Sequence, residues 1–339
     1  GPLLRRIGRK AVDGRQTALS VEAPIHTSPP EARLSERLLL PAARNFTERG
    51  YLRMPNKGLS ERMDGKTVIV TGPTSGLGLA TACELSRLGA RVALVGRDEQ
   101  RLQEAQKTIQ DFSGCEAANL PVYRADLSLL SEVRRVANDI RKAEKRIDVL
   151  VNNAGALFNQ RRETTEGFEC ALAINLLAPW LLIHELLPTL KESRAHVINV
   201  ASGGMYLQPV RLDDMDYIQG RYDGSKAYAR AKRALVDATA HLAAIHPEVR
   251  FNAMHPGWAA TPGVSKSLPG FEKVVGKRLR DSRMGADTIV WLASSNAASQ
   301  ASGLFWFDRE ARPTSVVAGT TTSAEKGQAL IEWLDRAAA

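Results

Sequence analysis

The chain has 339 residues, 44% of them hydrophobic and 24% charged, so it is long enough for one large domain or two small ones with a substantial core. The net charge is +9, but residues 1–60 carry +6 of it, which leaves only +3 for the remainder. A basic balance can indicate nucleic-acid binding. Here it belongs mostly to one terminal segment and no recognition motif accompanies it, so we expect no nucleic-acid partner.

Cysteine and histidine usage excludes two further classes of protein. The three cysteines, Cys83, Cys115 and Cys170, are too widely spaced for a disulfide framework or a CxxC metal site. The histidines show no ligand spacing, so we predict no metal. The longest apolar run, 171–183, is interrupted by Asn175 and Pro179, and we therefore expect no transmembrane segment.

Residues 1–60 form a basic, proline-containing N-terminal extension. Their arginine content is typical of an organelle transit peptide, whereas their five acidic residues argue against a complete one. We expect a mitochondrial location, with the cytoplasm as the alternative. The extension also leaves open a role in docking the chain to a partner protein or a larger assembly.

A regular alternation of short strands and longer helices begins after this extension. Strands are predicted at 67–71, 91–95, 121–124, 147–152, 195–200, 249–254 and 302–307. Helices are predicted after the first strand up to residue 88, at 98–111 and 127–145, after the fourth strand, and at 225–245 and 324–337. This order predicts an α/β fold with a doubly wound parallel sheet, a Rossmann fold, in a single domain at 65–310. Residues 311–339 form a C-terminal tail with a closing helix.

A glycine-rich turn joins the first strand to its helix. Its spacing is G-x-x-x-G-x-G, and such a turn lets the backbone approach a pyrophosphate at a helix N-terminus. An ordinary tight turn is the alternative, which the strand before and the helix after make less favoured. The residues predicted to contact the cofactor here are Gly72, Thr74, Ser75, Gly76, Leu77 and Gly78.

This spacing, with further motifs on the expected elements, resembles the short-chain dehydrogenase/reductase superfamily over 65–310. The segments 202–205, 228–233, 255–263 and 285–292 are most similar to its retinol-dehydrogenase-like branch. The resemblance implies further cofactor contacts by an Asp-Leu pair after the third strand, by the NNAG motif after the fourth, and by the PGxxxT motif after the sixth. These residues are Asp126, Leu127, Asn153, Ala154, Gly155, Pro256, Gly257 and Thr261.

The end of the second strand predicts which nicotinamide cofactor is used. Gly96 stands where an acidic residue would bind the adenosine ribose of NAD, and Arg97 follows it. A guanidinium there can bind a 2′-phosphate, so we predict NADP(H) as the cofactor. The alternative is that Arg97 is solvated at a helix start and that Asp98 is a simple N-cap.

The family's chemistry implies a tyrosine and a lysine four residues later on one helix, and the chain offers two such pairs. Counting 100° per residue from Tyr228, the apolar stripe of this helix lies at about 260–340° and Lys232 at about 40°, on its edge. Tyr222 and Lys226 fall at about 120° and 160°. That face also carries Arg230, Arg233 and Asp237, and we expect it to face solvent. We therefore predict Tyr228 and Lys232 as the catalytic pair, which would also contact the cofactor.

Two more residues complete the catalytic set that the resemblance implies. Ser202 ends the fifth strand, where the alternative is a turn or N-capping serine. Asn175 lies within the apolar helix after NNAG, where a buried amide must be hydrogen-bonded for either a structural or a catalytic reason.

Together these features predict an NADP(H)-dependent alcohol dehydrogenase or carbonyl reductase. Apolar residues after Ser202 (Met205, Tyr206 and Leu207) and after Gly257 (Trp258, Leu268, Pro269 and Phe271) suit a small lipophilic substrate, and the resemblance implies a retinoid, steroid or lipid aldehyde. These groups could instead close the core. The alternative function is a reductase-fold accessory subunit docked through residues 1–60. Family members often pair through helices, so the resemblance allows a homo-oligomer and the oligomeric state stays open.

Overall fold

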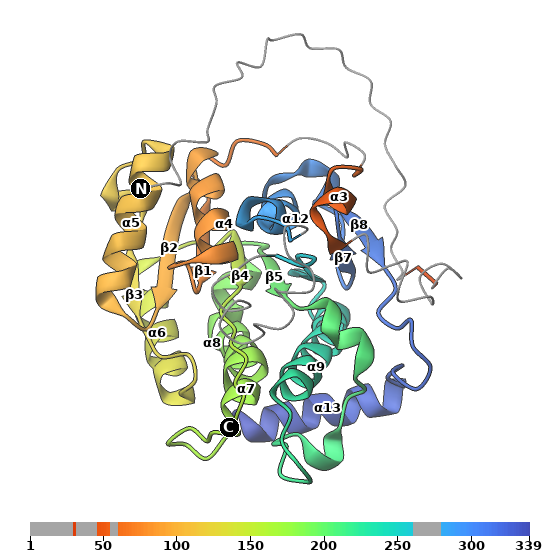
Figure 1. The fold of residues 1–339 in the computed structure, drawn as a ribbon. Coiled ribbons are helices and arrows are strands. Elements are labelled where there is room, and N and C mark those ends of the chain that lie inside the picture. The colour runs from red at the N-terminus through yellow and green to blue at the C-terminus, as the bar shows by residue number, and fades with distance from the viewer. Residues whose placement is uncertain (1–29, 32–45, 55–59, 260–278) are drawn as a thin grey trace.

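The computed structural model describes residues 30–31, 46–54, 60–259 and 279–339. Its centre is one eight-stranded sheet with helices on both faces (Figure 1). The strand order is β3-β2-β1-β4-β5-β6-β7-β8, and all neighbours are parallel except the last pair. The strands are β1 (Thr67–Thr71), β2 (Arg91–Gly96), β3 (Val122–Arg124), β4 (Val149–Asn152), β5 (His196–Val200), β6 (Arg250–Met254), β7 (Phe305–Phe307) and β8 (Glu310–Arg312). This arrangement confirms the doubly wound Rossmann fold.

The sheet is buried because its strands are built from β-branched and aliphatic residues on both faces. All five residues of β1 are buried, and so are all five of β5. The eighth strand was not predicted, because β8 is a three-residue, half-exposed edge strand without an alternating pattern. It pairs antiparallel with β7. The sheet therefore ends at Arg312, two residues beyond the expected boundary at 310.

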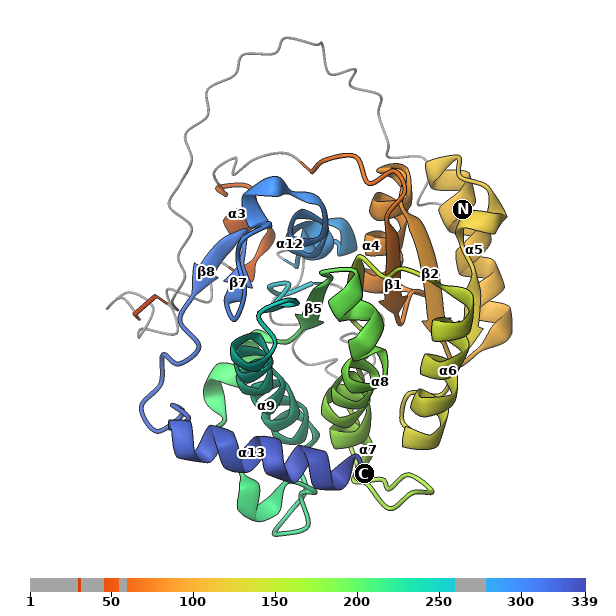
Figure 2. The same ribbon diagram turned by 180° about the vertical axis from the view of Figure 1, so that it is seen from behind.

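The helices are divided between the two faces, as Figure 2 shows from behind. In chain order they are α3 (Glu48–Tyr51), α4 (Gly76–Arg87), α5 (Glu99–Ser113), α6 (Leu130–Ala143), α7 (Cys170–Leu172), α8 (Ala178–Glu192), α9 (Gly224–Ile245), α12 (Ser282–Ser294) and α13 (Ala324–Ala337). Apolar residues of α4, α5 and α12 pack together on one face, and those of α6, α8 and α9 on the other. Helix α12, which was not predicted, begins at an Asp281 cap that accepts from the Met284 amide.

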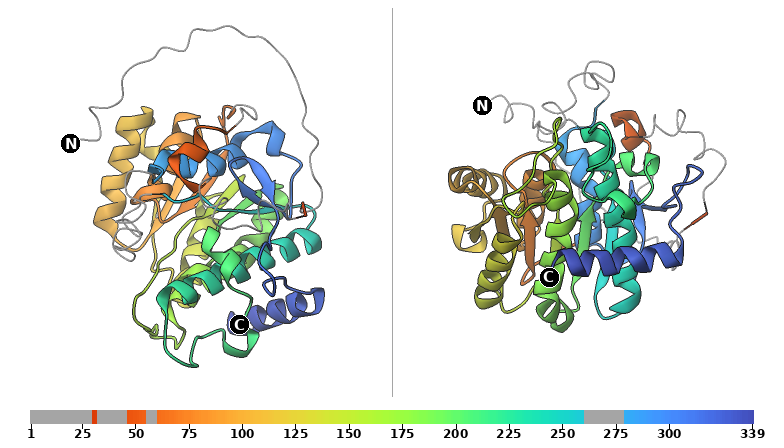
Figure 3. Two further views of the ribbon diagram at one scale, coloured as in Figure 1. Left: turned by 45° about the vertical axis from the view of Figure 1, so that its right-hand side comes forward. Right: turned by 90° about the horizontal axis from the view of Figure 1, so that it is seen from below.

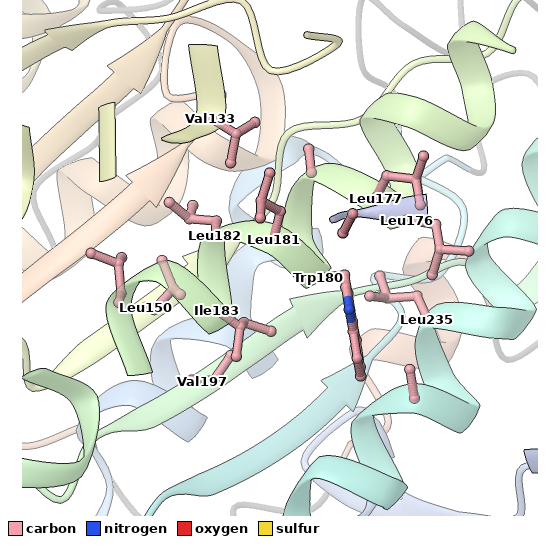
Figure 4. Close-up of a cluster of buried hydrophobic side chains, with 14 of the residues drawn as sticks. Val133, Leu150, Leu176, Leu177, Trp180, Leu181, Leu182, Ile183, Val197 and Leu235 are labelled. Carbon is pink, nitrogen blue, oxygen red and sulfur yellow. The ribbon is translucent and has the colours of Figure 1, made fainter. Parts of the chain in front are cut away.

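The larger core cluster lies between the sheet and the long helix after β4. Figure 4 shows part of it, with side chains from α6, β4, α8, β5 and α9, including Leu182, Val197 and Leu235. Helices α7 and α8 join through a π-helical turn, Ala173–Leu177. Such a turn changes the hydrogen-bond register and is often found at functional sites.

One helix, Cys170–Glu192, has the length and hydropathy of a membrane-spanning segment, although the sequence analysis expected none. Its most apolar window has a mean hydropathy of 1.7, and 72% of that window is buried inside the protein. The apolar character of this helix is thus used by the core.

The prediction of a solvent-facing side of α9 was wrong for Arg233, and Arg230 and Asp237 are also largely covered, with side chains 18% and 11% exposed. Only 1% of the Arg233 side chain is exposed, and it pairs with Asp237 at 3.2 Å and donates to the Thr314 carbonyl at 2.6 Å. Thr322 donates to the same Asp237 carboxylate at 2.6 Å. The C-terminal segment covers this face, and Figure 3 shows α13 lying beside α9 from two sides. The hydrophobic pattern of α9 could not predict this burial, because the covering residues are 81 or more positions later in the sequence.

Candidate active site

The glycine-rich turn and the NNAG turn brace each other at the carboxyl ends of β1 and β4. Gly72 has a φ of +66°, a left-handed conformation that favours glycine. A Cβ placed on Gly78 would lie 2.1 Å from the Gly72 carbonyl oxygen and 2.5 Å from the side-chain nitrogen Nδ2 of Asn153. Asn153 donates to the carbonyls of Thr71 at 2.9 Å and Gly72 at 3.2 Å, while the Thr71 hydroxyl accepts from the Asn153 and Ala154 amides.

The same turn leaves the start of α4 accessible. Thr74, Ser75, Gly76 and Leu77 are partly exposed, and the Ser75 side chain makes no capping hydrogen bond to the first turn of the helix. Backbone N–H groups at a helix N-terminus bind phosphate oxygens well. The predicted pyrophosphate contacts are thus partly exposed at the start of a helix whose first N–H groups Ser75 does not cap, and this backbone cradle fits a dinucleotide.

An open pocket of about 430 Å³ lies beside this cradle, at the ends of β2 and β3. Arg97 and Asp126 line it, as expected, together with Asp98, Glu99, Gln100 and Arg124. Asp98 does cap α5, accepting from the Arg101 amide at 3.1 Å, while Arg97 is exposed at the pocket. Arg97 thus lines the pocket, as the NADP(H) prediction requires, and Asp98 caps the helix, as the alternative stated.

Arg124 is a lining residue that the sequence analysis did not single out. It is the last residue of β3 and is paired in register with Gly96, which directly precedes Arg97. Its position two residues before Asp126 could have identified it. Leu127 is buried in the larger core cluster, so a ligand in this pocket would meet its backbone rather than its side chain.

The four predicted catalytic residues lie near the carboxyl ends of β4 and β5. They come from the π-helical turn (Asn175), the segment after β5 (Ser202) and α9 (Tyr228 and Lys232). A Cβ placed on Gly155 would lie 2.7 Å from Asn175 Oδ1 and 3.4 Å from Lys232 Nζ, so both polar groups converge at this turn. Asn175 lies in the π-helical turn and donates to the Ala156 carbonyl at 2.7 Å and the Ala171 carbonyl at 2.8 Å. Its side-chain amide therefore bonds both to Ala156, the residue after NNAG, and to its own helix, and its Oδ1 accepts from the Ala156 backbone N–H at 3.2 Å.

Lys232 and Tyr228 occupy one side of α9, next to Ser202. Lys232 is 2% exposed, its Nζ donates to the Val200 carbonyl at 2.7 Å, and burial lowers its pKa to about 7. Its Nζ lies 5.7 Å from the centre of the Tyr228 ring. Burial raises the pKa of Tyr228 to about 12, while a hydrogen bond with Ser202 acts in the opposite direction. Ser202 also accepts from the Gly204 amide at 3.3 Å.

The alternative pair, Tyr222 and Lys226, does not lie on one helix, because α9 begins between the two residues at Gly224. Tyr222 precedes α9 and donates a 3.0 Å hydrogen bond to Glu169, and burial beside that carboxylate raises its pKa. Lys226 is exposed in the first turn. A tyrosine that donates to a carboxylate, with an exposed lysine, is poorly arranged for proton transfer.

The turn after β6 completes the arrangement. Gly257 has a φ of +73°, and a Cβ on Gly285 of α12 would lie 2.5 Å from Leu77 and 3.5 Å from Pro256. This contact brings α12 against both predicted cofactor motifs. Thr261, Leu268, Pro269 and Phe271 lie outside the described residues.

Two residues expected to contact substrate are part of the core instead. Met205 and Tyr206 are buried against β6 and β7, and Tyr206 donates to the Pro313 carbonyl at 2.9 Å. Leu207 is 55% exposed, and Trp258 is partly exposed after the Pro256-Gly257 turn. Within the described ranges, no three histidine, cysteine or acidic side chains gather closely enough to hold a metal ion.

Comparison with known proteins agrees with this geometry. The sequence model of the short chain dehydrogenase family matches residues 66–270, and the chain therefore belongs to the short-chain dehydrogenase/reductase family of oxidoreductases. Dehydrogenase/reductase SDR family member 12 of Bos taurus is 39% identical over 302 residues, which cover 87% of this chain and 94% of that protein. Human retinol dehydrogenase 14 is 35% identical, covering 79% of this chain and 85% of that protein.

A solved structure from Beutenbergia cavernae, with NADP bound at low occupancy, is 27% identical. It covers 77% of this chain and 99% of that chain, with a TM-score of 0.60.

Proposed function

We propose that the protein is an NADP(H)-dependent oxidoreductase that interconverts a lipophilic alcohol and its carbonyl compound. The observation that carries this proposal is the convergence of Asn175 and Lys232 at Gly155, with Lys232 beside the Tyr228 ring and the Ser202 hydroxyl close enough to lower the pKa of that tyrosine. These groups meet at the carboxyl end of a parallel sheet, where α/β proteins bind their ligands.

Each polar group in this set has a distinct task. A nicotinamide dinucleotide held at the glycine-rich turn would supply the hydride donor for reduction of the carbonyl compound, or the hydride acceptor for oxidation of the alcohol. Ser202 and Tyr228 hold the substrate oxygen by hydrogen bonds, and Tyr228 gives that oxygen its proton during reduction. Lys232, when protonated, favours the phenolate that remains. Asn175 is a positioning residue that fixes the backbone after NNAG.

The cofactor preference rests on the pocket that Arg97 and Arg124 line. Two guanidinium groups and one open pocket suit a 2′-phosphate, since charged hydrogen bonds contribute about 1.5–3 kcal/mol each. The NADP-bound relative from Beutenbergia cavernae adds support. We expect Arg97→Asp to lower kcat/KM for NADPH by about 10- to 100-fold and to leave NADH turnover equal or better.

Matched variants make this test specific. Lys107→Met removes an exposed charge from α5 outside the pocket and should leave both cofactors unaffected. Arg124→Met should weaken NADPH more than NADH. An unchanged NADPH-to-NADH ratio in Arg97→Asp would overturn the assignment.

The proposed substrate class rests on the apolar side chains of Leu207 and Trp258, which follow the Ser202 and Gly257 turns and are exposed and partly exposed, and on the retinol dehydrogenase relatives. Retinal, a steroid ketone and a long-chain aldehyde can be compared with a short polar sugar ketone under NADPH. We expect the lipophilic compounds to have the higher kcat/KM. A preference for the sugar would contradict the proposal.

We also propose a mitochondrial location, on the arginine-rich residues 1–60 alone. Fusing these residues to a fluorescent protein tests it, and diffuse cytoplasmic fluorescence would count against it. The accessory-subunit alternative draws no support from the relatives or from the described residues, and a partner that binds residues 1–60 remains a prediction.

A further inference from the structure

Residues 46–51 precede the sheet domain in sequence but contact it near the predicted catalytic groups. The Phe46 ring lies edge-on to three aromatic rings, with centroid distances of 4.8 Å to His255, 5.1 Å to Phe307 and 5.8 Å to Trp258. His255 is itself stacked on Phe307 at 4.1 Å. Phe46 thus joins an aromatic cluster between the end of β6 and the β7–β8 hairpin.

Backbone and side-chain hydrogen bonds hold this segment at several points. The Phe46 carbonyl accepts from the Trp258 amide at 2.8 Å, and the Thr47 carbonyl accepts from Arg280 at 3.2 Å. Arg280 is buried and forms a bidentate pair with Asp308, at 2.6 and 2.8 Å. Tyr51 donates to Asp287 of α12 at 3.2 Å. A segment with so many partners is part of the folded domain.

Phe46 touches both turns that carry the predicted chemistry. A Cβ placed on Gly203, the residue after Ser202, would lie 3.2 Å from Phe46 Cε2. A Cβ placed on Gly257 would lie 2.9 Å from the Phe46 carbonyl oxygen. One residue from outside the sheet domain therefore abuts the turn after β5 and the turn after β6 at their glycines.

We propose that Phe46 is a positioning residue of the active site, which fixes the Ser202–Gly203 turn relative to the Pro256–Gly257 turn. The proposal rests on the function proposed above, because it assigns those turns to substrate and nicotinamide. Ser202 sits at the end of β5 and its hydroxyl must reach the Tyr228 oxygen. Removing the ring leaves Gly203 without its packing partner, and a glycine turn relaxes readily into such a space.

The expected consequence is a loss of rate rather than of cofactor binding. Displacing a reacting group by about 1 Å can cost roughly 100-fold in rate. The pocket at Arg97 and Asp126 lies at the ends of β2 and β3, near the opposite edge of the sheet from β6 and β7. Phe46 is not among the residues that line it. Phe46→Ala should therefore lower kcat by about 10- to 100-fold while the Kd for NADPH changes by less than about three-fold.

A second readout separates positioning from a general loss of structure. Because Ser202 and Tyr228 hold the substrate oxygen together, a displaced Ser202 should also raise KM for the carbonyl substrate. A merely structural defect would reduce the fraction of active protein, which lowers kcat and leaves KM unchanged.

The test uses the full chain with wild type, Phe46→Ala, Phe46→Leu and Leu52→Ala. Leu52 directly follows this segment and is 68% exposed, so its variant should match wild type. Phe46→Leu keeps an apolar filler and should give a kcat between wild type and Phe46→Ala. Melting temperatures and NADPH titrations accompany the rates. If Phe46→Ala does not fold, Phe46→Leu carries the test.

A folded Phe46→Ala or Phe46→Leu with the kcat and KM of wild type would overturn the positioning role. The control for the underlying function is Tyr228→Phe. If Tyr228→Phe stays active, the proposed function fails. If Tyr228→Phe is inactive and the Phe46 variants are normal, only the positioning role fails.

Discussion

Lys232 Nζ donates a 2.7 Å hydrogen bond to the carbonyl of Val200, two residues before Ser202. This bond ties α9 to the end of β5, so the lysine, the tyrosine one turn earlier and the serine form one rigid unit. The lysine is nearly fully buried, and its orientation is set before any ligand arrives.

The choice between two tyrosines is the most direct prediction. Tyr228→Phe should lower kcat by about 100- to 10,000-fold, because the proton donor is removed while the fold is kept. Tyr222→Phe breaks only the hydrogen bond to Glu169 and should retain most of the activity. Steady-state reduction of a carbonyl substrate with NADPH measures both. The reverse ranking would eliminate Tyr228 as the proton donor.

Stability should depend on pH through Lys232. Burial lowers its pKa from 10.5 to about 7, so between these values the unfolded chain binds more protons than the folded one. The free energy of unfolding therefore rises with pH over this range, by up to about 1.4 kcal/mol per pH unit. As the pH falls toward 7, the cost of keeping the buried lysine uncharged grows and the folded state loses this stability. Denaturant unfolding at pH 7, 8 and 9 is the measurement.

Lys232→Met is the comparison for that experiment, because it keeps the length of the side chain and removes the titrating group. The variant should gain stability relative to wild type most at pH 7 and least at pH 9. A difference that does not vary with pH would show that the lysine titrates normally. The range stops at about pH 9 because Tyr228 has a raised pKa and acts with the opposite sign above about pH 10.

Gly78→Ala should damage the dinucleotide cradle. The added methyl group would lie 2.1 Å from the Gly72 carbonyl oxygen, which is backbone and cannot move aside without disturbing the turn. We expect the Kd for NADPH to rise by at least about 10-fold and the stability to fall by about 1–3 kcal/mol. Gly327→Ala in α13 is the control, because no heavy atom lies within 4 Å of its added Cβ. It should bind NADPH normally and gain up to about 1 kcal/mol of helix stability.

The buried pair of Arg233 and Asp237 should matter for folding more than its exposed counterparts. Arg233→Met leaves the Asp237 carboxylate buried without its cation, which costs about 3–5 kcal/mol in comparable sites. Arg211→Met breaks an exposed pair with Asp213 and should leave the stability almost unchanged, because solvent screens such a pair. Urea unfolding of both variants tests the contrast. Equal losses would mean that the C-terminal segment does not bury the pair in solution.

The local pattern of the chain determined the strand positions, the glycine turn and the inward-facing tyrosine. Each of these depends on residues that are neighbours in sequence: β-branched runs in β1 and β5, a strand-to-helix glycine spacing, and a helical phase that separates Lys232 from Lys226. These features can be predicted from local sequence because they do not depend on which other part of the chain packs against them.

Tertiary structure alone decided what covers each face. Arg233 has the helical phase of a solvent residue, yet the chain beyond residue 313 closes over it. Phe46 lies in a segment without strand pattern, yet it reaches the turns after β5 and β6. Arg124 becomes a candidate for the cofactor pocket only because β3 pairs with β2 in register. In each case the deciding contact joins residues far apart in sequence, and the free energy of burial depends on that contact and not on the local pattern.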